Sequence, residues 1–512
     1  MPSYLSPGVY MEEVSSGSKP IEAVGTAVAA FVGFAAKGPL NEPMLVTNWT
    51  QFTATFGDFI PGSYLAHSVY GYFLNGGGVA YVVRIGSDGG NGNGSAPATG
   101  MAEIAAAGEA GRIAFTVRAL PATNANDISV EVVDASEPTD ETFKLVVKRG
   151  GTPVEEFDNV TTRRGAANSV ATAVRERSQL ITIEETRGRG LAVPTKGVAV
   201  ELAGASSVPV RVRATDYVGD SSDRTGFAGL EAVDEITMLC VPDLMAAYHQ
   251  GVIDSDGVQA VQLAMIAHCE LMADRVAVLD TPSGLNAQQV KEWRVNTTGY
   301  DSKYAALYWP WIKVMDPVTG RPTMVPPTGH VAGIWARNDA TRGVHKAPAN
   351  EVVRGAIAPE LNITKGEHDQ LNPVAVNCIR AFPGQGIRVW GARTMSSDPE
   401  WRYLNVRRLF NYVEESILQG TNWVVFEPND MKLWDSVKRT ITMFLRRVWR
   451  DGALFGRTPA EAFFVKCDEE NNPPENRDAG ILTVEIGIAP VKPAEFVVFR
   501  ISQFNEGSGV EE

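Results

Sequence analysis

Hydrophobic residues recur at helical spacing in the stretch that begins at Trp401 and ends near Gly420. Apolar side chains three and four positions apart lie on one face of an α-helix. We therefore predict an amphipathic helix here, with Gly420 as its left-handed C-cap, because glycine adopts a positive φ at no steric cost. The apolar positions that carry this prediction are Val406, Leu409, Phe410, Val413 and Ile417.

The next segment predicts a short strand and then a second helix. The run WVVF, from Trp423 to Phe426, favours a strand. Pro428 and Asn429 follow, a suitable N-cap position for a helix that runs to Gly452. At about 100° per residue, one face of this helix is apolar and the opposite face is basic. The apolar face holds Leu433, Val437, Ile441, Phe444, Leu445 and Val448. The basic face holds Lys432, Arg439, Arg446 and Arg450.

Three runs of alternating apolar and polar residues follow this helix. They are EAFFVKC (461–467), ILTVEIGIA (481–489) and EFVVFRISQF (495–504). An alternation with a period of two is typical of half-buried strands. The turn-rich sequence DEENNPPENRDAG separates the first two runs, and Pro490 and Pro493 separate the second from the third. We therefore expect a small sheet beside the basic helix.

The upstream part of the chain changes character at Ser87. Before it, GTAVAAFVGFAAKGP predicts a buried strand, LAHSVYGYFLNGG a short helix capped near Asn75 and Gly76, and VAYVVRI (79–85) a second strand. The Gly-rich stretch that starts at Ser87 cannot bury a core, so we place a domain boundary there. From about Met101 to Val210, short runs such as RIAFTVRAL and FKLVVKRG predict a compact, mostly β insertion.

Strand-like and helix-like segments alternate after Asp216. EITMLCVPD (235–243), RVAVLD (275–280) and YAALYWPWIKV (304–314) predict strands, whereas VQAVQLAMIAHCELMA and AQQVKEWRVNT predict helices. This alternation is typical of a parallel α/β layer with right-handed crossovers. The chain as a whole is therefore expected to be mixed α/β.

The composition is that of a folded protein with several domains. The 512 residues are 44% hydrophobic and 21% charged, and this length fits roughly two to four domains. The net charge of −14 disfavours a broad nucleic-acid-binding surface. The four scattered cysteines predict buried, reduced thiols, and the six histidines show no metal-ligand spacing. There is no leader-peptide pattern and no apolar run near the roughly 18 residues of a membrane span, so we expect synthesis and folding in the cytosol.

Two aspartates offer an alternative in which the chain is an enzyme. Asp243 and Asp280 each end a predicted parallel strand, which is where open α/β sheets place ligand-binding groups. The motifs that would support a catalytic site are missing: the chain has no GxxxxGK[ST] loop, no GxGxxG after a strand, no GxSxG elbow and no HExxH helix. We therefore expect no catalysis, no cofactor and no metal, and keep an α/β enzyme with its site at Asp243 and Asp280 as the alternative.

Longer strings resemble a known family. Residues 392–430, ARTMSSDPEWRYLNVRRLFNYVEESILQGTNWVVFEPND, resemble the core domain of contractile tail sheath proteins. These proteins form the outer sleeve of contractile phage tails, R-type bacteriocins and extracellular contractile injection systems. SPGVYMEEV (6–14), FVGFAAKGP (31–39) and NGGGVAYVVR (75–84) are similar to the N-terminal signature of the family. The resemblance implies a multi-domain sheath fold that polymerises as a helical sleeve around an inner tube and contracts.

The resemblance also implies roles for the two chain ends and for the basic helix. In the family, terminal arms link successive subunits by strand exchange. The matching residues here are Val9, Tyr10, Met11, Glu12, Glu13 and Val14, and Phe496, Val497, Val498, Phe499, Arg500 and Ile501. A helix of the C-terminal domain faces the inner tube, a role that falls to Lys432, Arg439, Arg446 and Arg450. The implied partners are neighbouring copies, the inner tube protein, and baseplate and cap proteins, without nucleic acid or membrane insertion.

These expectations divide the chain into six parts. Residues 1–20 form an N-terminal arm, 21–86 the first part of a core domain, and 87–215 an inserted, β-rich outer domain. Residues 216–345 form an inserted α/β domain, 346–494 the tube-facing second part of the core, and 495–512 a C-terminal strand or arm. A tube or baseplate component of the same machine is a further alternative. We expect assembly in the bacterial cytoplasm, and the sequence leaves the setting open among phage tail, bacteriocin and injection system.

Overall fold

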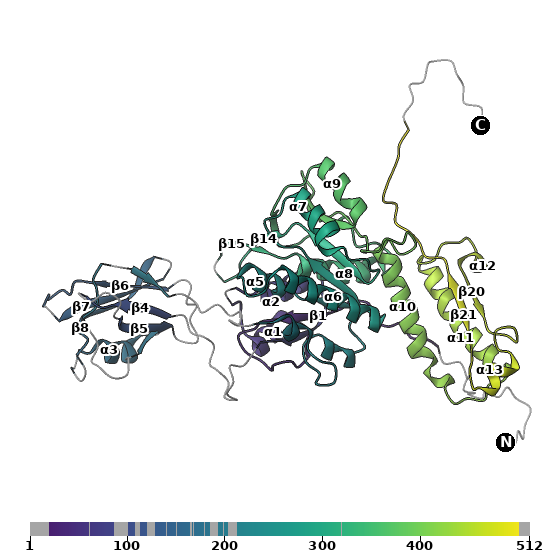
Figure 1. The fold of residues 1–512 in the computed structure, drawn as a ribbon, viewed down its shortest axis with the longest axis horizontal. Coiled ribbons are helices and arrows are strands. Elements are labelled where there is room, and N and C mark those ends of the chain that lie inside the picture. Colours follow the sequence, from purple (N-terminus) through teal and green to yellow (C-terminus); the bar gives the residue numbers. More distant parts are fainter. Residues whose placement is uncertain are drawn as a thin grey trace, which may run out of the picture.

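The computed structural model describes residues 20–500, except for residues 61, 87–100, 108–112, 120–127, 140, 150, 164–165, 167, 179, 185–192, 198, 203–211 and 319. This part of the chain forms an α/β domain, an inserted β domain and a C-terminal unit (Figure 1). The predicted arm residues Val9 to Val14 and Ile501 lie outside the described residues.

A nine-stranded sheet lies at the centre of the α/β domain. Its strand order is β16-β19-β18-β13-β12-β11-β1-β3-β2. Neighbouring strands from β18 to β3 pair in parallel, and the remaining pairs at the two edges are antiparallel. The predicted parallel α/β layer is therefore confirmed. The strands are β1 (Val28–Gly33), β2 (Met44–Val46), β3 (Val79–Arg84), β11 (Met238–Cys240), β12 (Val276–Asp280), β13 (Ala305–Trp309), β16 (Glu351–Val352), β18 (Val376–Phe382) and β19 (Gly386–Val389).

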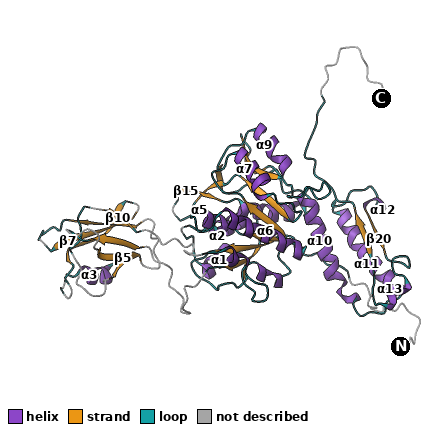
Figure 2. Cartoon of the chain, viewed as in Figure 1, coloured by secondary structure: helices purple, strands orange, loops and turns teal. Residues whose placement is uncertain are grey.

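Both faces of the central strands β1, β11, β12 and β13 are buried, which explains why these strands are apolar almost throughout. In β1, Ala30 and Val32 pack into the core on one face, whereas Ala29 and Phe31 pack into the core on the other. Helices cover both faces (Figure 2). The first core receives α4 (Ala214–Val218), α5 (Asp243–His249), α6 (Ser255–Met272), α7 (Ala287–Glu292) and α9 (Lys365–Leu371). The second receives α1 (Trp49–Phe56), α2 (Leu65–Asn75), α8 (Thr328–Arg342) and a three-stranded sheet of β14 (Ile312–Met315), β15 (Pro322–Val325) and β17 (Ala356–Pro359).

Helices α2 and α8 approach each other closely through glycines of α8. A Cβ atom on Gly329 would lie 2.2 Å from the carbonyl oxygen of Ser68, and one on Gly333 would lie 2.4 Å from that of Tyr72. The two glycines are four residues apart and so lie on the same face of α8. Because neither has a side chain, the backbones of the two helices can come into direct contact.

The inserted domain is a β fold with a hydrophobic core of its own. All buried residues of this core lie between Ala102 and Leu202. Its strand pairs are antiparallel and form two sheets, of order β4-β5-β9 and β10-β6-β7-β8. The elements are β4 (Met101–Ala105), β5 (Ile113–Ala119), β6 (Ile128–Val133), β7 (Thr142–Arg149), β8 (Thr152–Thr161), α3 (Val170–Arg177), β9 (Ile181–Glu184) and β10 (Ala199–Glu201).

The C-terminal unit packs two long helices and a two-stranded sheet around a fourth core. Every residue of the predicted apolar face of α11 is buried in it, so the amphipathic pattern is confirmed. The unit comprises α10 (Leu404–Thr421), α11 (Met431–Arg450), α12 (Pro459–Ala462), β20 (Phe463–Lys466), α13 (Pro474–Asp478) and β21 (Glu485–Ile488).

Two predictions about the connection between these helices were wrong. The run WVVF forms no strand; a 3₁₀ turn (Asn422–Val424) occupies its first part, because the run only bridges the ends of α10 and α11. Gly420 is not a C-cap, since α10 continues to Thr421 and its C-cap is Asn422. A Cβ on Gly420 would lie 2.6 Å from the Ile21 side chain, so the glycine allows the N-terminal chain to approach the helix.

Two boundaries differ from the prediction for local reasons. Asp430, and not Asn429, is the N-cap of α11, because its carboxylate accepts a hydrogen bond from the backbone N–H of Leu433 at 2.9 Å. The run YAALYWPWIKV is not one strand, since β13 ends at Trp309 and β14 starts at Ile312 in a different sheet. Pro310 lies between them and has no N–H for a strand ladder.

The central sheet crosses the boundaries that the sequence placed after residues 86, 215 and 345. Strands β1 and β3 come from 21–86, β11 to β13 from 216–345, and β18 and β19 from 346–494. The expectation of a separate α/β insertion between two parts of a core is therefore wrong for the sheet itself. Strand pairing across hundreds of residues leaves no local sign in the sequence, which explains the error.

Candidate assembly interface

The four predicted cations of α11 are exposed on the side of the helix that faces away from its core. Lys432, Arg439 and Arg446 are spaced by seven residues, about two helical turns, so they stand in a line along the helix. None of these three, nor Arg450, forms an ion pair with another described residue. This row of cations can therefore contact an acidic surface outside the chain, and its orientation towards a tube stays a prediction.

The described end of the chain exposes four consecutive apolar side chains. The exposed fractions are 74% for Phe496, 68% for Val497, 78% for Val498 and 84% for Phe499. Residues 491–500 belong to no helix or strand, and Figure 1 shows the end of this segment running away from the folded body. The described part of the predicted strand, residues 495–500, is therefore not paired within the single chain. A segment of high strand propensity with exposed apolar side chains is suited to pairing with another molecule.

The small sheet of the C-terminal unit has only two strands. β20 and β21 pair antiparallel, from Phe463 with Ile488 to Lys466 with Glu485, as the sequence predicted for the first two alternating runs. Phe463 is buried against the core, whereas Phe464 on the other face is 59% exposed. A two-stranded sheet is marginal by itself and keeps two edges at which further strands can pair.

A buried ion pair joins α10 to the α/β domain. The guanidinium of Arg408 donates to both carboxylate oxygens of Asp339 in α8, at 3.0 and 2.5 Å, and to the backbone oxygen of Thr26 at 2.9 Å. The two charged side chains are only 3% and 4% exposed. A bidentate pair of this kind fixes the position of α10 relative to α8. This contact was not predicted, although an arginine next to the apolar positions of an amphipathic helix is a signal for a buried partner.

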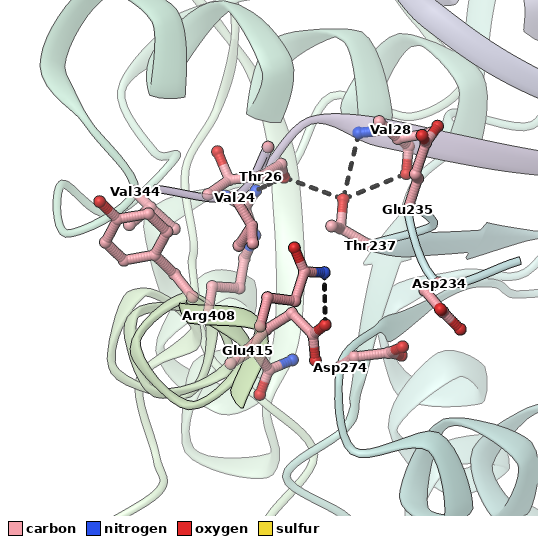
Figure 3. Close-up of a pocket in the computed structure, with 14 residues that line it drawn as sticks. Val24, Thr26, Val28, Asp234, Glu235, Thr237, Asp274, Val344, Arg408 and Glu415 are labelled. Carbon is pink, nitrogen blue, oxygen red and sulfur yellow. Dashed lines mark hydrogen bonds between the residues drawn. The ribbon is translucent and has the colours of Figure 1, made fainter. Parts of the chain in front are cut away.

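A groove lies between the start of β1 and the middle of α10, with a volume of about 270 Å³ (Figure 3). Four carboxylates contribute to its lining: Asp234, Glu235, Asp274 and Glu415. Thr237 also lines the groove, and its hydroxyl donates to the backbone oxygen of Thr26 at 2.9 Å. The lining contains neither Asp243 nor Asp280 and no cysteine, serine or histidine, so the groove lacks the usual parts of a nucleophilic site.

Asp243 has a structural role in the loops around α2. Its carboxylate accepts hydrogen bonds from the backbone N–H of Phe34 at 2.6 Å, from the Ser63 hydroxyl at 2.9 Å, and from the backbone N–H groups of Tyr64 and Leu65. The side chain is fully buried. Burial raises its pKa to about 6, although these hydrogen bonds act in the opposite direction.

Asp280 lies in a different environment, at the end of β12 and next to Thr328 at the start of α8. Burial raises its pKa to about 7. Asp243 and Asp280 share no hydrogen-bond partner among the described residues, and neither lines the groove. The two predicted enzyme residues therefore have separate partners, although β11 and β12, at whose ends they lie, are neighbours in the sheet.

The described residues contain no group of three or more His, Cys, Asp and Glu side chains placed to hold a metal ion. All four cysteines are buried and free, as predicted. None of the described helices has the length and hydropathy that a membrane crossing requires.

Family models match two adjoining stretches of the chain. Residues 228–395 match the phage tail sheath protein central domain, and residues 396–504 match the phage tail sheath C-terminal domain. Together they span more than half of the chain.

Among curated proteins, the tail sheath protein of Burkholderia phage BcepMu is 23% identical over 513 residues, which cover 96% of this chain and 95% of the relative. A putative prophage major tail sheath protein of Pseudomonas aeruginosa is 26% identical over 249 residues, 48% of this chain and 61% of the relative.

Solved structures have the same fold along almost the whole chain. The helical sheath of the anti-feeding prophage in its contracted state has a TM-score of 0.59 and 23% identity, and the match covers 98% of this chain and 100% of that one. The PVC sheath complex of an extracellular contractile injection system, also contracted, has a TM-score of 0.57 and 22% identity, with 98% and 99% covered. The resemblance inferred from the sequence is confirmed, and this chain belongs to the family of contractile phage tail sheath proteins.

Proposed function

We propose that this chain is the subunit of a contractile sheath, which polymerises as a helical sleeve around an inner tube and contracts to drive that tube through a target envelope. The observation that carries the proposal is the exposed segment from Phe496 to Phe499. The same chain also contains a two-stranded sheet, β20 with β21, to whose edges further strands can pair. A subunit that both donates a strand and accepts one can connect head to tail without closing into a ring, and so forms a helix.

Strand exchange at the two chain ends holds the sleeve together. The donated strands are Val9 to Val14 and Phe496 to Ile501, and the accepting sheet is that of β20 and β21 in a neighbouring copy. At about 1 kcal/mol net per hydrogen bond, a strand that makes roughly four or five bonds contributes a few kcal/mol per link. Links of this strength persist while weaker contacts between subunits break.

The basic row on α11 faces the inner tube. Exposed Lys and Arg contacts are individually worth only about 0–1 kcal/mol, so a row of them keeps the tube in register and still releases it. The exposed state of Lys432, Arg439 and Arg446 supports this role, because none of them forms an ion pair with a carboxylate of the described residues.

Contraction is a change in packing between subunits that are themselves rigid. The buried pair of Arg408 with Asp339 makes the C-terminal unit and the α/β domain move together. If the compact lattice has a lower free energy than the lattice assembled on the tube, a trigger at one end releases a travelling rearrangement, with the arms acting as hinges. The energy is stored during assembly, so the chain needs no nucleotide, cofactor or active site.

The partners that follow are neighbouring copies, an inner tube protein, a baseplate and a cap protein, with assembly in a bacterial cytoplasm. A baseplate containing a similar chain is known from the anti-feeding prophage, where a chain with 23% identity has a TM-score of 0.57. The alternative of an α/β enzyme has less support, because Asp243 and Asp280 lie in separate environments.

Electron microscopy tests the proposal directly. The full chain produced together with its inner tube protein is expected to form long striated sleeves. Discrete small particles with hydrolase activity that depends on Asp243 or Asp280 would contradict the sheath function and favour the enzyme.

Reversing the charge of the basic row is expected to weaken tube binding. The double substitution Arg439→Glu and Arg446→Glu introduces repulsion at two exposed positions, and we expect the apparent affinity for the tube to fall about 10- to 30-fold at low salt. The loss shrinks as added salt screens the charges. The measurement is co-sedimentation of subunits with preformed tubes. Lys313→Glu with Lys365→Glu is the matched control, since both lysines are exposed and lie outside α11. Equal tube binding by both double variants would show that the row faces elsewhere.

A further inference from the structure

The chain returns from the C-terminal unit to the α/β domain before its exposed segment begins. After β21, the backbone N–H of Val491 donates to the oxygen of Ala453 at 3.2 Å, and the side-chain amide of Asn405 donates to the oxygen of Val491 at 3.1 Å. Four residues later the chain reaches Glu495. The path therefore crosses the junction of the two bodies just before the segment that we propose as the arm.

Glu495 is held by three side chains from distant parts of the sequence. Its Oε1 accepts from Arg393 Nε at 2.8 Å and from Asn372 Nδ2 at 2.8 Å. Its Oε2 accepts from Arg393 Nη2 at 2.6 Å and from the Tyr403 hydroxyl at 3.1 Å. Every hydrogen bond is made to a single carboxylate, and the Arg393 contact is bidentate, the strongest geometry for such a pair. We call Glu495, Arg393, Asn372 and Tyr403 the arm-root clamp.

The arm-root clamp is tied to the central sheet. The backbone N–H of Arg393 donates to Asn377 Oδ1 in β18 at 2.7 Å, and Asn377 Nδ2 donates back to the oxygen of Arg393 at 2.8 Å. Asn377 is fully buried. The guanidinium of Arg393 also donates to the backbone oxygen of Asn372 at 3.0 Å. A force applied at Glu495 therefore reaches the nine-stranded sheet through two short steps.

The environment favours the charged form of Glu495. Burial by itself raises the pKa of this carboxyl, but the hydrogen bonds from Arg393 and Asn372 outweigh burial and lower it. The side chains of Arg393 and Glu495 are 10% and 20% exposed, so solvent screens the pair only weakly. The clamp thus stays ionised and intact at neutral pH.

The burial and the hydrogen bonding of the chain change abruptly at Glu495. Glu495 is partly buried and fully bonded, whereas the next five described residues, Phe496 to Arg500, are all exposed. Pro490 and Pro493 lie between β21 and the clamp, so they are on the restrained side of it. The first position at which the chain is released is therefore directly after Glu495.

We propose that the arm-root clamp is the fixed pivot of the C-terminal arm, and that it passes the load from an exchanged strand to the central sheet of the donor subunit. The inference rests on the proposed function of the arm and adds the residues that anchor it. Without the clamp, tension on the arm would act on the two-stranded sheet of β20 and β21. This sheet has only four residue pairs and is weaker than the nine-stranded central sheet. With it, the small sheet of the donor is spared and stays free to hold a neighbour's strand.

The test uses Glu495→Gln, which keeps the size of the side chain and removes its charge. In the unassembled full chain, we expect hydrogen exchange of the backbone amides between Val491 and Glu495 to accelerate on the order of 10- to 100-fold. Exchange in α10 and β20 should not change. In assembled particles, we expect sleeves of this variant to form and then to lose their subunit links on contraction, which electron microscopy shows as fragmented contracted sheaths.

Two further variants keep the test decisive. Tyr403→Phe removes one hydrogen bond of the clamp and should give a smaller acceleration at the same amides. Glu470→Gln removes the carboxylate of a surface ion pair with Lys466. The Glu470 side chain is 80% exposed, so this variant should change neither readout.

The proposal is overturned if exchange between Val491 and Glu495 in Glu495→Gln equals that of the wild type, if α10 loosens equally, or if the variant sleeves contract intact. If the wild-type chain forms no sleeves, the proposed function fails instead, and the exchange measurement still decides whether the clamp holds the arm root.

Discussion

Removing either terminal segment is expected to leave a folded subunit that forms no sleeves. Deletion of residues 1–14 removes the N-terminal strand, and deletion of residues 496–512 removes the C-terminal one. The first described residue that belongs to a hydrophobic core is Ile21, and the described residues after Glu495 are all exposed, so neither deletion takes away core packing in the described part of the chain. The deletions therefore remove contacts between subunits and leave the folding of each subunit unchanged.

The size of the effect follows from the number of hydrogen bonds. A link of roughly four or five bonds contributes a few kcal/mol, which corresponds to about a 100- to 1,000-fold change in the equilibrium for adding one subunit. Because every subunit along the sleeve loses the same link, assembly should be abolished, whereas the midpoint of thermal unfolding should stay within a few degrees of the full chain. The measurements are electron microscopy and circular dichroism.

Deletion of residues 507–512 is the matched control. It removes the sequence GSGVEE and keeps the strand-like run from Phe496 to Phe504. This shorter chain should assemble and contract normally. Normal, contractile sleeves from either of the two longer deletions would show that the corresponding arm does not link the subunits.

Patterns that repeat within one element could be read from the sequence. The apolar face of α11 and the basic row opposite it were predicted residue by residue, because helix geometry alone decides which side chains share a face. The strands β20 and β21 were predicted for the same reason, from alternation within four to nine residues. The errors at Trp423 to Phe426 and at Gly420 arose where a neighbouring element, not the local pattern, decided the conformation.

Contacts between distant residues could not be read from the sequence. The order of the nine-stranded sheet depends on pairings such as β1 with β11, whose residues are about 210 positions apart in the chain. The arm-root clamp brings together residues 372, 393, 403 and 495; Glu495 opens the alternating run 495–504, but alternation along one run does not indicate its partners elsewhere in the chain. The only local indication of the clamp in the sequence was the glutamate before the run FVVF. This pattern does not distinguish it from the many glutamates that lie on protein surfaces.

Replacing Gly329 by alanine is expected to destabilise the α/β domain by about 3 kcal/mol or more. The added Cβ would meet three backbone atoms of Ser68, at 2.2, 2.4 and 2.5 Å, all shorter than any ordinary contact. A flexible side chain could move aside, but backbone in the middle of α2 cannot. The two helices would therefore have to separate, which opens the core around His330, whose ring lies against Gly71 on the same interface.

Gly366→Ala supplies a control at the same position of another helix. Gly366 is the second residue of α9, as Gly329 is of α8, so the gain in helix propensity is comparable. No atom lies within 4 Å of a Cβ built on Gly366, and we expect this variant to be more stable by a few tenths to about 1 kcal/mol. Denaturant unfolding followed by tryptophan fluorescence measures the difference in the relevant part of the molecule, because all ten tryptophans lie outside residues 87–215. Equal unfolding midpoints for the two variants would show that α2 and α8 are not in direct backbone contact.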